Sequence, residues 1–270
     1  MARPCDAFRV AAITSRRHPI AARFRDAARG NESQALIDGW HLLYEAAAAG
    51  LVIDLVAVVD RPPHDRDANL LDRLSRSGVT VVTVATSVMS ALSPVRTPTG
   101  VVSLVQRRDG DLARVANALQ PLVVVAVDVQ DPGNLGAMVR AAEAGGATGV
   151  ICGGITADPW GWKALRAAMG STFRLPLHRD RDVASVCQAL RDRGVRVMAT
   201  VPTGAERMYE VDLRGPTALL FGGEGDGLGA DVLRAADSRI TIPMQPAVDS
   251  LNVAVATGIL VYEARRQRNS

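Results

Sequence analysis

The sequence is poor in cysteine and lysine and contains no long uninterrupted apolar run. Its three cysteines, Cys5, Cys152 and Cys187, lie far apart without a CxxC pair, so neither a disulfide framework nor a metal site is predicted. No stretch of about 18 apolar residues is present that could span a bilayer. The first residues also lack the apolar core and cleavage pattern of a signal peptide. The expected location is therefore the cytoplasm, with no membrane partner.

Positive charge comes almost entirely from arginine, because Lys163 is the only lysine. The formal net charge of +3 is mildly basic, which is compatible with a nucleic-acid partner without identifying one. An arginine side chain can bind a phosphate through two parallel hydrogen bonds. Charge alone leaves the class of protein open.

The length of 270 residues favours two domains, each large enough for its own core. In residues 1–108, segments with helical spacing of apolar residues alternate with β-branched runs such as LVIDLVAVVD and VTVVTV. This alternation predicts a small α/β domain. The charged sequence RRDGD interrupts the apolar pattern and marks the predicted linker.

Residues 109–270 repeat the alternation of strands and helices. The run PLVVVAVDV is typical of a strand buried on both faces, and the strand-like segments after it are separated by helical ones. The predicted fold class of this domain is α/β, with a mostly parallel sheet covered by helices on both faces.

A first group of polar residues follows the buried strand, in residues 128–146. Asn134 stands just beyond the carboxyl end of that strand, where open α/β sheets bind their ligands. Arg140 comes six residues later, on nearly the opposite face of a helix by angle, although the start of the helix could bring both over one edge. An isolated helix arginine is usually solvated, but the adjoining turn favours a functional role here.

A second group is the glycine-rich stretch at residues 221–229. Glycines around Glu224 allow the backbone to approach a ligand closely. Their spacing does not follow GxGxxG, which argues against dinucleotide binding, and no alternating oxygen ligands indicate a calcium loop. A simple connecting turn is the alternative, but a buried carboxylate usually has a cationic partner.

A third group begins the last predicted helix. Ser250 stands at the expected N-cap, and capping explains this serine about as well as catalysis does. Asn252 is expected one turn inside the helix, where capping does not explain it.

These three stretches, in this order, strongly resemble the signature motifs of the SpoU/TrmH family of RNA ribose 2'-O-methyltransferases, in the SPOUT superfamily. The matching sequences are DPGNLGAMVRAA, LLFGGEGDGL and IPMQPAVDSLNVAVATGILVYE. KALRAAMGSTFRLPL resembles the family's intervening motif, with Ala168 where serine is usual. The resemblance covers the chain after Pro121, and the N-terminal block more loosely resembles the family's substrate-binding domain, which has a ribosomal-protein-like α/β fold.

The resemblance implies a deep trefoil knot, S-adenosylmethionine as cofactor, and a homodimer whose active sites draw on both subunits. It implies two domains: an RNA substrate-binding domain, 1–108, and a SPOUT methyltransferase domain, 109–270. By motif position, the cofactor-binding residues would be Thr200, Val201, Gly222, Ile242 and Leu251.

The catalytic residues implied by the resemblance are Arg140, Asn134, Glu224, Ser250 and Asn252. A guanidinium is protonated at ordinary pH and is a poor base, so Arg140 is expected to hold a phosphate and to stabilise the developing alkoxide. Glu224 would position Arg140 or Asn134. In the N-terminal domain, the candidate RNA contacts are Arg16, Arg17, Arg23, Arg25 and Arg29, for which simple solvation is the alternative.

The implied reaction is methylation of a ribose 2'-hydroxyl in RNA, with 23S ribosomal RNA favoured. A transfer RNA substrate is one alternative, and a non-catalytic RNA-binding protein that kept the fold is another. The presence of all five catalytic residues argues against the second.

Replacement of Arg140 by alanine tests the central assignment. We expect Arg140→Ala to lose methylation of RNA while it still binds S-adenosylmethionine, because the arginine acts on the RNA. The two activities are measured separately, by methyl transfer and by calorimetry. Retained turnover would refute the assignment, and loss of both activities would indicate a structural role.

Overall fold

The computed structural model describes residues 12–61, 63–108 and 110–269. They form two compact units, which divide between Arg108 and Asp109. The segment Trp160–Phe173 groups with the first unit, although it lies in the range expected for the methyltransferase domain, 109–270. Within the described residues, no helix is long and apolar enough to cross a membrane.

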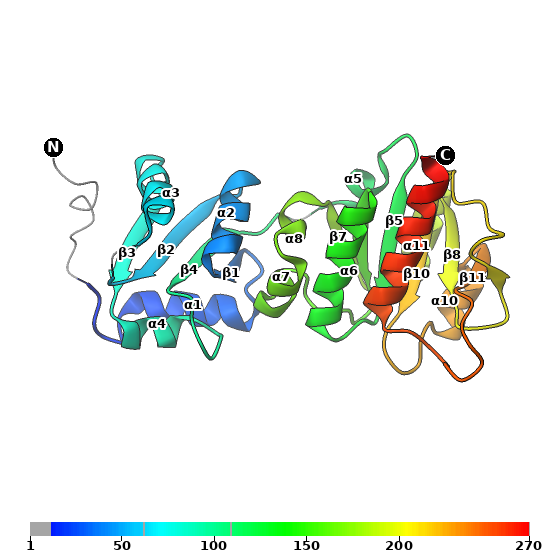
Figure 1. Cartoon of the computed structure of the whole chain (residues 1–270). Helices are drawn as coiled ribbons and strands as arrows, with labels where there is room; N and C mark the ends of the chain where they lie inside the picture. Colours follow the sequence, from blue (N-terminus) through cyan, green and yellow to red (C-terminus); the bar gives the residue numbers. More distant parts are fainter. Residues whose placement is uncertain (1–11, 62, 109, 270) are drawn as a thin grey trace. The chain divides into compact units, whose positions relative to one another are not determined.

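The first unit is built on a four-stranded sheet (Figure 1). The strand order is β1-β4-β2-β3, in which β4 is antiparallel to both of its neighbours and the other three strands run parallel to one another. Its elements are α1 (Pro19–Gly30), β1 (Gln34–Asp38), α2 (Trp40–Ala48), β2 (Ile53–Val59), α3 (Asp65–Arg76), β3 (Thr80–Val84), α4 (Thr86–Leu92), β4 (Val101–Gln106), α7 (Trp162–Ala168) and most of α8 (Ser171–Arg174).

Apolar stripes on the helices explain the three layers of this unit. On α3, the three leucines at 70, 71 and 74 are buried, as their helical spacing predicts. They join α2 in one core on one face of the sheet, and α1 and α4 form a second core on the other face. Trp160, Leu165 and Phe173 belong to the first of these cores, which is why their segment groups with this unit.

The second unit contains a seven-stranded sheet in the order β7-β6-β5-β10-β8-β11-β9, and every pair of neighbouring strands is parallel. The predicted α/β class with a mostly parallel sheet is therefore confirmed. Its elements are α5 (Leu112–Ala116), β5 (Leu122–Val127), α6 (Pro132–Gly145), β6 (Gly149–Gly153), β7 (Leu177–Asp180), α9 (Val183–Arg191), β8 (Arg196–Thr200), β9 (Glu206–Arg207), β10 (Thr217–Gly222), α10 (Ala230–Ala235), β11 (Ser238–Thr241) and α11 (Val253–Arg268).

Helices cover both faces of this sheet, and all six residues of β5 are buried. Helices α5, α9 and α10 share one core with the strands, while α6 and α11 lie side by side on the other face (Figure 1). The two helices approach closely at Gly145, where a Cβ atom would overlap the Val261 side chain. Gly258, on α11, is less tightly packed: a Cβ atom added there would have the Ala141 Cβ, at 4.0 Å, as its nearest neighbour.

Substitution by alanine should change stability in opposite directions at Gly145 and Gly258. Gly145→Ala should lower the free energy of unfolding by about 1–3 kcal/mol, because the added methyl overpacks the contact between α6 and α11. Gly258→Ala should raise it by about 0.5–1 kcal/mol, because alanine is favoured over glycine inside a helix. Urea unfolding followed by circular dichroism measures both. An equal effect of the two variants would contradict the packing described here.

Candidate active site

A cavity of about 350 Å³ opens at the carboxyl ends of β8, β10 and β11. This is the sheet edge at which parallel α/β folds bind ligands. The cavity is lined by eight of the residues singled out in the sequence: Thr200, Val201, Gly222, Glu224, Ile242, Ser250, Leu251 and Asn252. Its apolar walls also include Phe221, Met244 and Val253.

The glycine-rich loop after β10 folds back on itself along one wall of the cavity. A Cβ atom at Gly222 would lie 2.5 Å from both the Gly227 carbonyl oxygen and the Leu228 nitrogen, so the loop cannot close over a larger residue. Gly225 and Gly227 have φ values of 106° and 65°, which favour glycine. The prediction that glycine allows a close backbone approach here therefore has a specific geometric basis at Gly222.

Asn252 caps the last helix, so the prediction that it lies one turn inside the helix is wrong. Its Oδ1 accepts hydrogen bonds from the backbone nitrogens of Ala254 at 3.0 Å and Val255 at 3.3 Å. The predicted N-cap at Ser250 is wrong, because the helix begins at Val253, two residues later than expected. Ser250 is exposed at the cavity, in the non-helical segment before the helix.

Capping fixes the orientation of the Asn252 amide, because its oxygen must face the helix. The Nδ2 group is then free to donate to Asn134 Oδ1 at 3.0 Å. The Asn134 Nδ2 group in turn donates to Glu224 Oε1. The three polar side chains, which come from the three separate sequence stretches, thus form one directed chain of hydrogen bonds.

Asn134 is itself held at the first turn of α6. Asp131 caps this helix, and its Oδ1 accepts from the Asn134 backbone nitrogen at 2.7 Å. Of the two partners proposed for Glu224, the structure places Asn134 against it. No hydrogen bond or ion pair joins Glu224 to Arg140 among the described residues.

Arg140 lies on the exposed side of α6, outside the residues that line the cavity. Its side chain makes no hydrogen bond or ion pair within the described part of the chain. The six-residue spacing from Asn134 rotates the two side chains far apart around the helix, so the helix start does not bring them together.

The remaining predicted positions lie in the first unit. Ala168 is buried near the end of α7. The five arginines proposed to contact RNA are all exposed on α1 or just before it, and Arg16 Nε donates to the Ser87 carbonyl at 2.9 Å.

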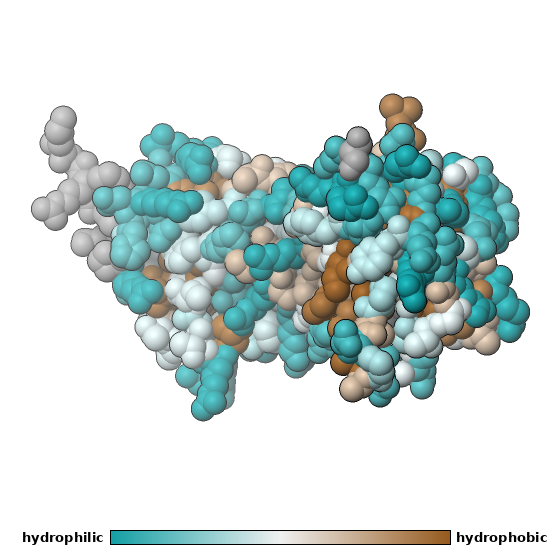
Figure 2. All heavy atoms as spheres, turned by 45° about the vertical axis from the view of Figure 1, so that its right-hand side comes forward, coloured by the Kyte–Doolittle hydropathy of each residue, from teal (hydrophilic) through white to brown (hydrophobic). Residues whose placement is uncertain are grey.

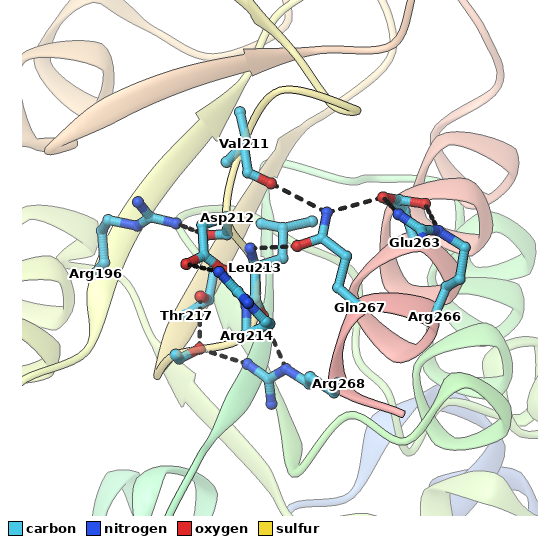
Figure 3. A network of polar contacts seen from close by, with 11 residues as sticks. Arg196, Val211, Asp212, Leu213, Arg214, Thr217, Glu263, Arg266, Gln267 and Arg268 are labelled. Carbon is cyan, nitrogen blue, oxygen red and sulfur yellow. Dashed lines mark hydrogen bonds and ion pairs between the residues drawn. The ribbon is translucent and has the colours of Figure 1, made fainter. Parts of the chain in front are cut away.

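A polar network at the far end of α11 was not predicted from the sequence (Figure 3). Arg268 donates to the backbone carbonyls of Gln120, Pro121, Leu213 and Gly215. Burial lowers the pKa of the Arg268 guanidinium, and the four carbonyl oxygens compensate for its lost hydration.

Gln267 completes the attachment. Its Oε1 accepts from the Leu213 nitrogen at 2.8 Å, and its Nε2 donates to the Val211 carbonyl at 3.0 Å (Figure 3). These bonds hold the end of α11 opposite to Asn252. An arginine in the last turn of a helix is usually solvated, so Arg268 gave no signal in the sequence. The carbonyl groups that Arg268 and Gln267 contact also lie far from them in the sequence, so no local pattern predicts this attachment.

A parallel sheet with a glycine-walled cavity at its carboxyl edge is typical of α/β proteins that bind ligands. Its particular family follows from comparison with known sequences. The sequence model of the SpoU rRNA Methylase family matches residues 121–262, and the chain belongs to this family. The resemblance inferred from the three motifs is thereby confirmed.

Similar proteins extend the match over nearly the whole chain. An uncharacterised tRNA/rRNA methyltransferase of Synechocystis sp. is 33% identical, over 96% of this chain and 95% of that protein. The 23S rRNA guanosine-2'-O-methyltransferase RlmP of Bacillus subtilis is 34% identical, over 85% of this chain and 88% of that protein. The crystal structure of an AdoMet-bound rRNA methyltransferase from Sinorhizobium meliloti is 31% identical, with a TM-score of 0.85 over 94% of this chain and 97% of that one.

Two substitutions of Asn252 distinguish its capping of the helix from its hydrogen bond to Asn134. Asn252→Ala should lower the free energy of unfolding by about 1 kcal/mol, because the helix loses its capping acceptor. Asn252→Asp should lose less stability than Asn252→Ala, since aspartate also caps the helix, although it loses the amide donor to Asn134. Urea unfolding compares the two, with Ser250→Ala as the control variant, because Ser250 does not cap the helix. Equal destabilisation by both Asn252 variants would contradict the capping role.

Proposed function

We propose that this protein transfers a methyl group from S-adenosylmethionine to a ribose 2'-hydroxyl of ribosomal RNA, with 23S RNA favoured. The observation that carries the proposal is the cavity, which is lined by implied residues of the second and third stretches, while Asn134 of the first stretch bonds to two of those lining residues, Glu224 and Asn252. The names of the Bacillus subtilis and Sinorhizobium meliloti relatives support the reaction and the cofactor. A transfer RNA substrate is the second candidate, because the Synechocystis relative is named for both RNAs.

The cavity suits S-adenosylmethionine in size and chemistry. Its volume of about 350 Å³ is within the range of roughly 300–1,000 Å³ for small-molecule sites. Ile242 and Leu251 provide apolar walls. Gly222 has no Cβ, which would collide with the loop at Gly227, so its backbone can line the cavity directly. Thr200 and Val201 complete the wall after β8. When bound, the cofactor supplies a methyl group on a positively charged sulfur.

The polar chain beside the cavity would orient the target ribose. Asn134 and Asn252 hold fixed amide directions, and Glu224 terminates the chain as an acceptor. Ser250 offers a hydroxyl at the same rim. The unpaired Arg140 guanidinium would bind the phosphate beside the target ribose and stabilise the developing alkoxide.

A homodimer is part of the proposal. Arg140 lies outside the cavity of its own chain, which supports a site completed by a second subunit. The second unit also exposes Val248, Val255 and Tyr262, whose exposed fractions are 44–52%. Figure 2 shows hydrophobic residues gathered among mostly hydrophilic ones on the visible face. Exposed apolar residues of this size suit burial in an interface.

The knot and the role of the first unit are also proposed. Strand β10 lies between β5 and β8, both earlier in the chain, and α11 returns to pack on α6, which supports a threaded C-terminal segment. The first unit, with its exposed arginines 16, 17, 23, 25 and 29, would bind the RNA substrate. A ribosomal RNA substrate would place the protein in the cytoplasm.

The proposed cofactor site is tested at Gly222. Gly222→Ala should weaken S-adenosylmethionine binding at least tenfold and lower methylation of ribosomal RNA to match, because the added Cβ displaces the loop from the cavity wall. Gly229→Ala is the control, since a Cβ there meets nothing within 4 Å. Calorimetry measures binding, and transfer of a labelled methyl group measures activity.

A wild-type protein that binds no S-adenosylmethionine would overturn the enzymatic proposal and favour a non-catalytic RNA-binding protein. A Gly222→Ala variant with normal binding would show that the cofactor lies elsewhere.

A further inference from the structure

A second cavity, in the first unit, has no assigned role. Its volume is about 290 Å³, and it lies at the edge where the parallel strands β1 and β2 end and β4 begins. Trp40 lines it from the start of α2, and Arg61 and His64 line it from the segment after β2. Asp67, in the first turn of α3, closes one side. Carboxyl edges of parallel strands are preferred ligand sites in α/β folds.

Glycine shapes the mouth of this cavity. Gly100 has a φ of 98°, and a Cβ there would lie 3.1 Å from Val59 Cγ1 and 3.3 Å from the Arg61 guanidinium. The Arg61 side chain therefore lies directly over bare backbone. It makes no hydrogen bond or ion pair within the described residues, so its donors are available to a ligand.

Asp67 is oriented by a neighbour on α2. The Tyr44 hydroxyl donates to Asp67 Oδ1 at 2.9 Å, which leaves Oδ2 available as an acceptor. Burial, and then the hydrogen bond to Asp67, raise the pKa of Tyr44, so the phenol remains a donor. The Arg66 guanidinium lies 4.2 Å from the centre of the Tyr44 ring and further restrains it. The cavity thus presents a fixed carboxylate, a free guanidinium and an indole.

We propose that this cavity binds an unpaired guanine of the RNA substrate, an inference that rests on the proposed function. Proteins recognise single-stranded RNA by stacking bases on aromatic side chains and by hydrogen bonding to the base edges. Trp40 supplies the stacking surface, Arg61 donates to guanine O6 or N7, and Asp67 accepts from guanine N1–H and N2–H.

The pairing of donor and acceptor favours guanine over the other bases. Guanine alone presents two adjacent donors beside a carbonyl oxygen on its Watson–Crick edge. Adenine and cytosine place a ring-nitrogen acceptor where the Asp67 carboxylate would lie, and two acceptors repel. Uracil offers a single N–H donor. The exposed arginines of α1 offer phosphate contacts without such selection.

The experiment uses the full chain and labelled single-stranded hexanucleotides: U6, the same oligonucleotide with one central G, and the same with one central A. Fluorescence anisotropy should show roughly tenfold tighter binding of the G-containing RNA. Asp67→Asn should abolish this preference, and Arg61→Ala should weaken binding of the G-containing RNA. Arg76→Ala is the matched control, because Arg76 lies at the other end of α3 and pairs with Asp72.

Methylation of ribosomal RNA provides a second readout. Asp67→Asn should raise the KM for RNA about tenfold, with kcat and the Kd for S-adenosylmethionine unchanged. Circular dichroism confirms that each variant is folded.

Three outcomes would overturn the inference: no preference for guanine, a preference that survives in folded Asp67→Asn, or unchanged binding of the G-containing RNA by folded Arg61→Ala. Failure of the proposed function is distinguishable, because a wild-type protein that binds no cofactor but still selects guanine would leave this inference supported.

Discussion

The capping of α11 by Asn252 is the interaction on which the arrangement of the proposed active site depends. An amide has one acceptor side and one donor side, and the helix takes the acceptor. The donor must then point to Asn134, whose own donor must point to Glu224. One backbone requirement therefore sets the direction of every hydrogen bond along the cavity rim. Side chains that are 90 and 118 residues apart in the sequence become a single polar unit.

Parallel pairing of strands makes this meeting possible. Val127, at the end of β5, pairs with Gly222, at the end of β10, so the segments that follow both strands emerge together. The turn after β5 leads directly into α6 and Asn134, and the loop after β10 carries Glu224. Because Gly222 and Gly223 lack side chains, the loop can lie against its own backbone and against the carbonyl of Asp128. The sheet register and the glycines together bring the two stretches into contact.

Much of the fold was predictable, because local patterns determine it. The apolar run in β5 predicted a buried parallel strand, and the leucine spacing on α3 predicted its buried face. Six predicted residues that line the cavity belong to the second and third of the motifs that resemble the family: Gly222, Glu224, Ile242, Ser250, Leu251 and Asn252. The start of α11 was misplaced, since Ser250 and Asn252 are both good capping residues and only the tertiary contact with Asn134 distinguishes them.

Other features depend on contacts distant in sequence, which no local pattern reveals. The grouping of Trp160–Phe173 with the first unit depends on apolar packing against a core built from distant parts of the chain, β1 among them. The partner of Glu224 could not be chosen between Asn134 and Arg140 until the rotation around α6 was known. The cavity beside Trp40 has no sequence signature, because its members come from separate parts of the chain: the start of α2, the stretch from the end of β2 to the first turn of α3, and Gly100.

Helix α11 is fixed at both ends by side chains that bond to specific backbone groups, Asn252 at one end and Arg268 with Gln267 at the other. Insertion or deletion of one residue within a helix rotates the parts on either side by about 100° and shifts them by about 1.5 Å along the axis. Such a change could preserve one attachment but not both. The length of this helix, 16 residues, is therefore constrained by its two ends as well as by the packing of its buried face.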